Sequence, residues 1–222
     1  MSAFPLERKE LSASEEAAGI LAHSIRIRTP NPPGNERPLA ETYVSLLASE
    51  AIDARVIPVP SDSGAALVPT ETPAQRALAW ARYPGRGTQP PLVLLSHLDT
   101  VDADPADWDH DPFAGTRIGD YIIGRGAIDA QGVGVVHVLT LMELARRGLP
   151  LDRDLILLAT PDEEAGGIHG AGYVTRAHRD LLGNARYLLT EGNDAQAKRA
   201  ARRSRVKSTR KRSAQRGEAQ PS

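Results

Sequence analysis

Three short apolar segments, each followed by a polar cluster, limit most strongly how this chain can fold. Residues 92–95 (Leu-Val-Leu-Leu) and 155–159 (Leu-Ile-Leu-Leu-Ala) are continuous apolar runs, and residues 186–189 form a third strand candidate. Runs of this length without alternation are typical of strands buried on both faces of a sheet, and we expect all three strands to be buried. Residues 131–147 and 168–182 between them predict helices. We therefore expect an α/β fold of three layers, a sheet with helices on both faces.

The N-terminal part predicts further elements of the same domain. Residues 12–27 form an amphipathic helix pattern, and Ser12 with Glu15 makes a capping box at its start. The sequence Thr-Pro-Asn-Pro-Pro-Gly at residues 29–34 ends this helix, because proline lacks a backbone N–H and glycine tolerates positive φ. The remaining expected elements are a helix at 39–51, strands at 54–59 and 76–82, and a surface loop at 60–74.

The charge of the chain changes abruptly near residue 193. The formal net charge is −1, yet residues 194–222 hold ten Lys and Arg against only Asp194 and Glu218. Val206 is the only residue of the Val, Ile, Leu, Phe, Tyr and Trp set after Leu189. Such a segment buries too little apolar surface to offset the entropy of ordering. The expected organisation is a folded domain at residues 1–193 followed by a disordered basic tail at 194–222.

Composition excludes several classes of protein. The chain has no cysteine, which excludes disulfide scaffolds, thiolate-bound metal centres and cysteine nucleophiles. Its longest apolar runs are far shorter than the roughly 20 residues that cross a bilayer, so we expect no membrane partner. The first residues lack the apolar core of a signal peptide, and we therefore expect a cytoplasmic protein.

Polar clusters follow all three strand candidates, and a fourth cluster precedes the helix that starts near residue 131. Because sites in open α/β sheets form beyond the carboxyl ends of the strands, we expect these clusters to converge. Their imidazole and carboxylate side chains belong to His97, Asp99, Asp129, Glu163, Glu164 and Glu191. So many carboxylates repel each other unless a cation lies among them. Imidazole and carboxylate ligands without sulfur suit Zn²⁺, Mn²⁺ or Co²⁺.

Spacing within the clusters suggests distinct roles. His97 and Asp99 lie two residues apart, on the same side of an extended chain, so Asp99 can accept the second ring N–H of His97. Glu163 and Glu164 are adjacent and point in different directions, so that one can bind metal while the other faces a water molecule. Each motif alone is more often a solvated turn or a surface pair. The metal hypothesis rests on their shared position at strand ends.

Five segments follow one another in a recognisable order. They are Ser-His-Leu-Asp-Thr-Val (96–101), Trp108 with Asp-Pro-Phe (111–113), Gly-Arg-Gly-Ala-Ile-Asp (124–129), Pro-Asp-Glu-Glu (161–164) with Gly-Gly (166–167), and Glu-Gly (191–192). Together they resemble the co-catalytic zinc aminoacylase/carboxypeptidase family, which includes acetylornithine deacetylase, succinyl-diaminopimelate desuccinylase and glutamate carboxypeptidases. The N-terminal segment 29–36 also fits, and the resemblance covers about residues 12–193.

The resemblance implies a role for each site residue. Asp129 would bridge two zinc ions, with cobalt or manganese as alternatives. His97 and Glu191 would complete the ligands of one ion, and Glu164 would bind the other. Glu163 would be the general base that takes a proton from the bridging water, and Asp99 the partner of His97. The implied function is hydrolysis of amide bonds in N-acyl amino acids or small peptides.

The chain also departs from the family pattern. Family members are roughly twice as long and carry a lid and dimerisation domain, followed by a final His ligand, where this chain becomes rich in Arg and Ala. We therefore hypothesise a frameshift or truncation near residues 193–200, an incomplete second metal site and weak or absent activity. The alternative is a non-catalytic fragment whose basic tail binds nucleic acid non-specifically or binds nothing. The tail has no aromatic residue for base stacking, so we do not expect a nucleic acid partner.

Overall fold

The computed structural model describes residues 11–60 and 75–192, and the chain divides into two units, Met1–Thr190 and Glu191–Ser222. The fold below is that of the first unit. Residues 61–74 of the loop expected at 60–74 lie outside the described residues. The basic tail expected at 194–222 lies outside them as well.

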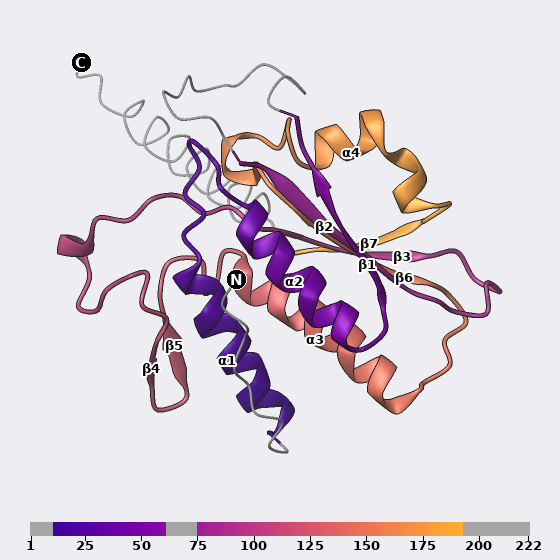
Figure 1. Ribbon diagram of the computed structural model, residues 1–222, viewed down its shortest axis with the longest axis horizontal. Helices are drawn as coiled ribbons and strands as arrows, with labels where there is room; N and C mark the ends of the chain where they lie inside the picture. The colour runs from indigo at the N-terminus through magenta and orange to yellow at the C-terminus, as the bar shows by residue number, and fades with distance from the viewer. Residues whose placement is uncertain (1–10, 61–74, 193–222) are drawn as a thin grey trace, which may run out of the picture. The chain divides into compact units, whose positions relative to one another are not determined.

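A five-stranded mixed sheet forms the centre of the first unit, with the strand order β1-β2-β6-β3-β7 (Figure 1). Its strands are β1 (Asp53–Pro58), β2 (Ala77–Tyr83), β6 (Leu155–Thr160), β3 (Leu92–His97) and β7 (Tyr187–Leu189). β3 pairs in parallel with both β6 and β7, whereas β2 pairs antiparallel with β1 and β6. The parallel strands are those whose sequences predicted burial on both faces.

Both faces of the sheet carry helices, which confirms the three-layer α/β fold. Along β2, Ala77, Ala79 and Ala81 face one apolar core, and Leu78 and Trp80 face the other. The first core lies under α1 (Ala13–Arg26), α2 (Arg37–Ser49) and α3 (Gln131–Arg147), and the second under α4 (Ala171–Ala177) and η3 (Arg179–Leu182). Figure 1 shows the first three helices on one side of the sheet and α4 on the other.

Local sequence explains where the best-predicted helices begin and end. The Ser12 side chain accepts from the Glu15 backbone, and the Glu15 carboxylate accepts from the Ser12 backbone, so the predicted capping box starts α1. α3 has the bounds that the sequence predicts, and it ends at Gly148 in the left-handed region (φ 57°). α3 packs closely on the sheet at Gly134, where a Cβ would lie 3.0 Å from the Tyr43 hydroxyl and 3.2 Å from Ser96 Oγ.

The predicted helix at residues 168–182 is wrong in part. The structure has the short helix α4, a break at His178 (φ −137°, ψ 40°), and then the 3₁₀ helix η3. The helix starts late because Gly170, directly before Ala171, has a non-helical backbone (φ −104°, ψ −113°). At the break, the His178 ring packs edge-on against Tyr173, 5.1 Å between ring centroids. The two residues are five apart in the chain, and the apolar pattern of the segment did not indicate the break.

The prediction that the third strand is buried is also wrong. The β7 residues Tyr187, Leu188 and Leu189 are 54%, 58% and 53% exposed. Within the first unit, β7 is the last strand of the sheet and pairs with β3 alone. Four further short elements were not predicted. They are the strands β4 (Thr116–Ile118) and β5 (Tyr121–Ile123), which form a hairpin, and the 3₁₀ helices η1 (Pro105–Asp107) and η2 (Glu163–Ala165). None of the helices in the described ranges is long and apolar enough to cross a membrane.

Candidate metal centre

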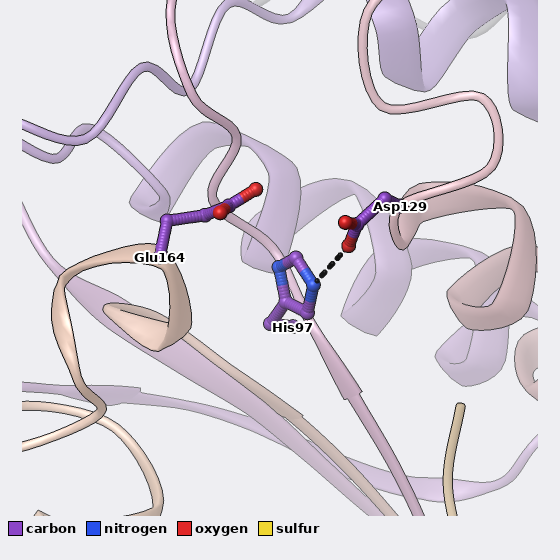
Figure 2. Close-up of side chains that lie close together, drawn as sticks. All are labelled: His97, Asp129 and Glu164. Atoms are coloured by element: carbon purple, nitrogen blue, oxygen red, sulfur yellow. Dashed lines mark hydrogen bonds and ion pairs between the residues drawn. The ribbon is translucent and has the colours of Figure 1, made fainter. Parts of the chain in front are cut away.

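Three elements bring one imidazole and two carboxylates together. β3 ends at His97, directly beside Thr160 at the end of the parallel strand β6. The turn after β6 becomes η2, which carries Glu164, and Asp129 lies two residues before α3 begins. The polar clusters at the carboxyl ends of β3 and β6 and the cluster before α3 therefore meet, as the βα architecture requires. Figure 2 shows His97 between Asp129 and Glu164.

The distances within this group suit a metal ion. One ligand atom from each of His97, Asp129 and Glu164 lies within 4.8 Å of the other two. His97 Nε2 and Asp129 Oδ1 are 2.9 Å apart. Two ligands about 2.0–2.2 Å from zinc are separated by about 2.9–3.5 Å when the angle at the metal is between 90° and tetrahedral. The imidazole is 2% exposed and the Asp129 side chain 68%, so the group opens to solvent on its carboxylate side.

The His97 ring is oriented for ligation through Nε2. Its Nδ1 lies 2.9 Å from the backbone carbonyl oxygen of Asp99, which only accepts hydrogen bonds, so Nδ1 carries a proton. In the neutral ring Nε2 then presents a lone pair to the Asp129 carboxylate, and two acceptors face each other. A proton or a metal ion must lie between such groups. The donor set of one imidazole and two carboxylates therefore fits a divalent metal such as zinc.

Asp99 is a buried connecting residue of the site. Its carboxylate accepts the backbone N–H groups of Glu163 and Glu164 at 3.0 Å each, and the Asn31 amide at 2.8 Å. Its Oδ1 lies 3.5 Å from His97 Nδ1, farther than its own backbone carbonyl. Burial alone raises the pKa of Asp99, but hydrogen bonds from His97, Asn31 and the Glu164 backbone outweigh burial and lower it. Asp99 thus links the histidine to the turn that carries both glutamates.

Glu164 lies in a more negative environment. Desolvation and the nearby Asp129 carboxylate raise the pKa of Glu164, while His97 and the Val101 backbone N–H, 3.3 Å from Glu164 Oε1, act in the opposite direction. Repulsion between two carboxylates that converge on one point is what a bound cation would relieve. The electrostatics therefore agree with the ligand geometry.

The other two predicted site residues are placed less closely. Glu163 is exposed and occupies the first position of η2, next to Glu164, with its backbone fixed on Asp99. It is not part of the group of three ligands found among the described residues. Glu191 begins the second unit of the chain, so its role as a ligand stays a prediction.

Sequence reasoning missed a buried polar network beside the site. Arg76 donates to Glu36 Oε1 at 2.7 Å and to Asn31 Oδ1 at 2.8 Å, and its Nη2 lies 3.2 Å from Asp162 Oδ1. Asn31 and Glu36 lie in the Pro- and Gly-rich segment 29–36, for which the sequence pattern predicts a helix stop but no polar network. Two polar residues in a loop constrained by proline and glycine are the sequence feature that could have indicated this network.

We predict that Glu36 makes stability depend on pH. Desolvation raises the pKa of Glu36 to about 8, although Arg76 lowers it. In the folded state Glu36 thus keeps a proton that it loses in the unfolded chain above its ordinary pKa of 4.5. The contribution of this proton to the free energy of unfolding is therefore complete below about pH 4.5 and is lost as the pH rises through about 8. In the Glu36→Gln variant the side chain at this position is uncharged at every pH. The stability of this variant relative to the wild type should rise by on the order of a few kcal/mol between pH 5 and 8.

Urea denaturation at both pH values measures this effect. Glu41→Gln is the matched control, because Glu41 lies on α2 in an exposed ion pair with Arg37. Parallel pH dependences for the wild type and Glu36→Gln would contradict the prediction.

Comparison with curated proteins finds relatives that are similar to part of this chain. The chain is 40% identical over 83 residues to succinyl-diaminopimelate desuccinylase of Methylobacterium sp. (strain 4-46), covering 36% of this chain and 21% of that protein. It is 37% identical over 111 residues to aminoacylase-1 of Sus scrofa, covering 48% and 27%. The chain thus spans about a quarter of the length of these relatives.

Solved structures share the fold. Human carnosine dipeptidase 1 matches with a TM-score of 0.67 at 20% identity, over 81% of this chain and 39% of that one. Comparison with protein families matches residues 93–203, half of the chain, to Peptidase family M20/M25/M40. This segment includes the three clustered ligands His97, Asp129 and Glu164. The expected family resemblance is confirmed, and the chain belongs to Peptidase family M20/M25/M40.

Proposed function

We propose that this chain carries a metal centre for hydrolysis of amide bonds, with N-acyl amino acids or small peptides as substrates. The observation that supports this most is the convergence of His97, Asp129 and Glu164, within 4.8 Å, in the segment that matches the peptidase family. The relatives named as a desuccinylase, an aminoacylase and a dipeptidase support the substrate class. Zinc is the proposed metal, with cobalt or manganese as alternatives, because the ligands are imidazole and carboxylate.

Each residue of the site has a separate role in the proposed reaction. A divalent metal held by His97, Asp129 and Glu164 would supply polarisation of the scissile carbonyl and acidification of a water molecule. The Asp99 carbonyl keeps the proton on His97 Nδ1, so Nε2 faces the Asp129 carboxylate as the nitrogen that would bind the metal. Glu163, exposed at the rim on the same turn as Glu164, is the proposed base that accepts the water proton and passes it to the leaving amine.

The described residues support one firmly held metal. Three ligands with an open position are enough for a catalytic zinc site. The exposed Asp129 carboxylate can also bridge to a second ion. Among the described residues of the first unit, no second group of candidate ligands is found for that ion. We therefore expect about one metal per chain and slow turnover, because a single metal acidifies water and polarises the carbonyl less than a pair does.

Hydrolysis of an N-acetyl amino acid and of an unmodified dipeptide, followed by amine release with and without added zinc, tests the proposal. Turnover should require metal. Glu163→Gln should reduce it about 10²- to 10⁴-fold while metal content stays unchanged. Glu41→Gln, an exposed glutamate on α2, is the control and should behave as the wild type. Turnover without metal, or full activity of Glu163→Gln, would overturn the mechanism.

A further inference from the structure

The polar network beside the metal centre is built around one buried cation. The Arg76 side chain is 10% exposed, the Glu36 side chain is fully buried, and the Asp162 side chain is 4% exposed. Besides Glu36 and Asp162, the guanidinium contacts Asn31 Oδ1 at 2.8 Å and the Pro33 carbonyl oxygen at 3.0 Å. A guanidinium with this many oxygen contacts is held in one orientation, because its planar fork fixes the directions of all its N–H groups.

The backbone is shaped to receive this guanidinium. Gly34 has a φ of +91°, and a Cβ placed there would collide with the guanidinium carbon of Arg76. Gln75, the neighbour of Arg76, donates to the Gly34 carbonyl at 3.1 Å and accepts from the Arg37 backbone at 3.1 Å. The loop at residues 31–37 is thus fastened to the chain segment that carries Arg76. Only glycine allows the close approach and the backbone conformation together.

The first connection to the metal centre runs through Asn31. Arg76 is a donor only, so the Asn31 side chain turns its oxygen toward Arg76 and its NH₂ toward the carboxylates. That NH₂ donates to Asp99 Oδ2 at 2.8 Å and to Asp162 Oδ1 at 3.3 Å. Arg76 therefore orients the amide that holds the Asp99 carboxylate. Asp99 in turn binds the backbone of both glutamates.

The second connection runs through Asp162. This residue has a left-handed backbone (φ 74°, ψ 14°) and directly precedes η2, which carries Glu163 and Glu164. Its carboxylate is fixed by Arg76 on Oδ1 and by the His169 backbone N–H, 2.8 Å from Oδ2. A non-glycine residue keeps such a conformation when its surroundings hold it there. Arg76 thus also anchors the start of the turn that presents Glu164 to the site.

We propose that Arg76 is a positioning residue of the metal centre, which acts through Asn31 on Asp99 and through Asp162 on the turn that carries Glu164. This inference rests on the proposed metal function. Arg76 touches none of the three ligands in the described contacts. Its removal would leave the buried Asp162 carboxylate without its cation, and it would leave Asn31, which donates to both Asp162 and Asp99, without the partner that orients it. Asp99 would then lose the position in which it binds the Glu163–Glu164 backbone.

The test compares the wild type with Arg76→Met, Arg76→Lys and Arg82→Met. Arg82 lies on β2 and forms a half-exposed ion pair with Asp154, so Arg82→Met is a matched loss of an arginine ion pair away from the site. One readout is the Kd for Co²⁺. The other is hydrogen exchange of the Glu163 and Glu164 amides in the metal-free protein, which reports their bonds to Asp99 directly.

Arg76→Met should weaken Co²⁺ binding about 10- to 100-fold, the usual effect of losing a group that orients metal ligands. It should also speed exchange of the two amides at least about tenfold relative to amides of the central strand β6, which a general loss of stability would not do. Arg76→Lys keeps the charge but not the fork, so it should fold and fall between Arg76→Met and the wild type. Arg82→Met should match the wild type in both readouts.

The experiment separates failure of the positioning role of Arg76 from failure of the proposed metal centre. Unchanged exchange of the Glu163 and Glu164 amides in both Arg76 variants would overturn the positioning role, whatever the metal affinity. Faster exchange throughout the chain in both variants, with none specific to these amides, would overturn it as well. Absence of Co²⁺ binding by the wild type would instead overturn the metal centre, and with it the proposed function.

Discussion

His97→Ala is expected to abolish tight metal binding. His97 is the buried ligand of the group, and its Nε2 lies 2.9 Å from Asp129 Oδ1. The substitution leaves two carboxylates from separate elements, which bind a divalent ion weakly and repel each other. The affinity for zinc or cobalt should fall by more than the about 10–100-fold that loss of an orienting neighbour costs. Isothermal titration of metal-free protein measures the change.

His110→Ala is the control for this experiment. His110 is exposed, lies outside the group of three ligands among the described residues, and should bind metal as the wild type does. Equal metal affinity of His97→Ala and the wild type would mean that the ion binds elsewhere.

Leu157→Ala is expected to give the largest loss of stability. Leu157 is fully buried in the middle of β6, between Ala81 of β2 and Leu94 of β3. Its side chain belongs to the core beneath α1, α2 and α3, which has few means of closing a cavity at the centre of the sheet. We expect the free energy of unfolding to fall by about 3–5 kcal/mol, in the range measured for buried leucines.

Urea denaturation measures this loss, with Leu188→Ala as the matched control. Leu188 lies on the edge strand β7 and is 58% exposed, so the same truncation should cost less than about 1 kcal/mol. Similar costs at both positions would show that β6 is not the centre of the core.

The sequence predicted best those elements that short-range patterns determine. β6 is an uninterrupted apolar run and is buried at every position, and α3 has the predicted bounds because a left-handed glycine ends it. The predicted 168–182 helix failed at Gly170 and His178, whose backbones are not helical. Burial of β7 also depends on what covers it in space, and its residues are half exposed. Local composition carries no information on either point.

The candidate site shows the same division. His97, Asp129 and Glu164 were named from strand and helix ends, and the structure brings them together. The network of Glu36, Arg76 and Asp162 was missed because its members are far apart in the chain, and no short-range sequence pattern connects them. Arg76 and Glu36, for example, are 40 residues apart and meet only after the loop at 31–37 packs beside β2.

Anomalous X-ray diffraction at the zinc edge, from crystals of the zinc-loaded chain, tests the central claim most directly. The account predicts a peak within about 2.0–2.2 Å of His97 Nε2 and of one carboxylate oxygen each from Asp129 and Glu164. A peak at another site, or zinc-soaked crystals without a peak between these three side chains, would contradict it.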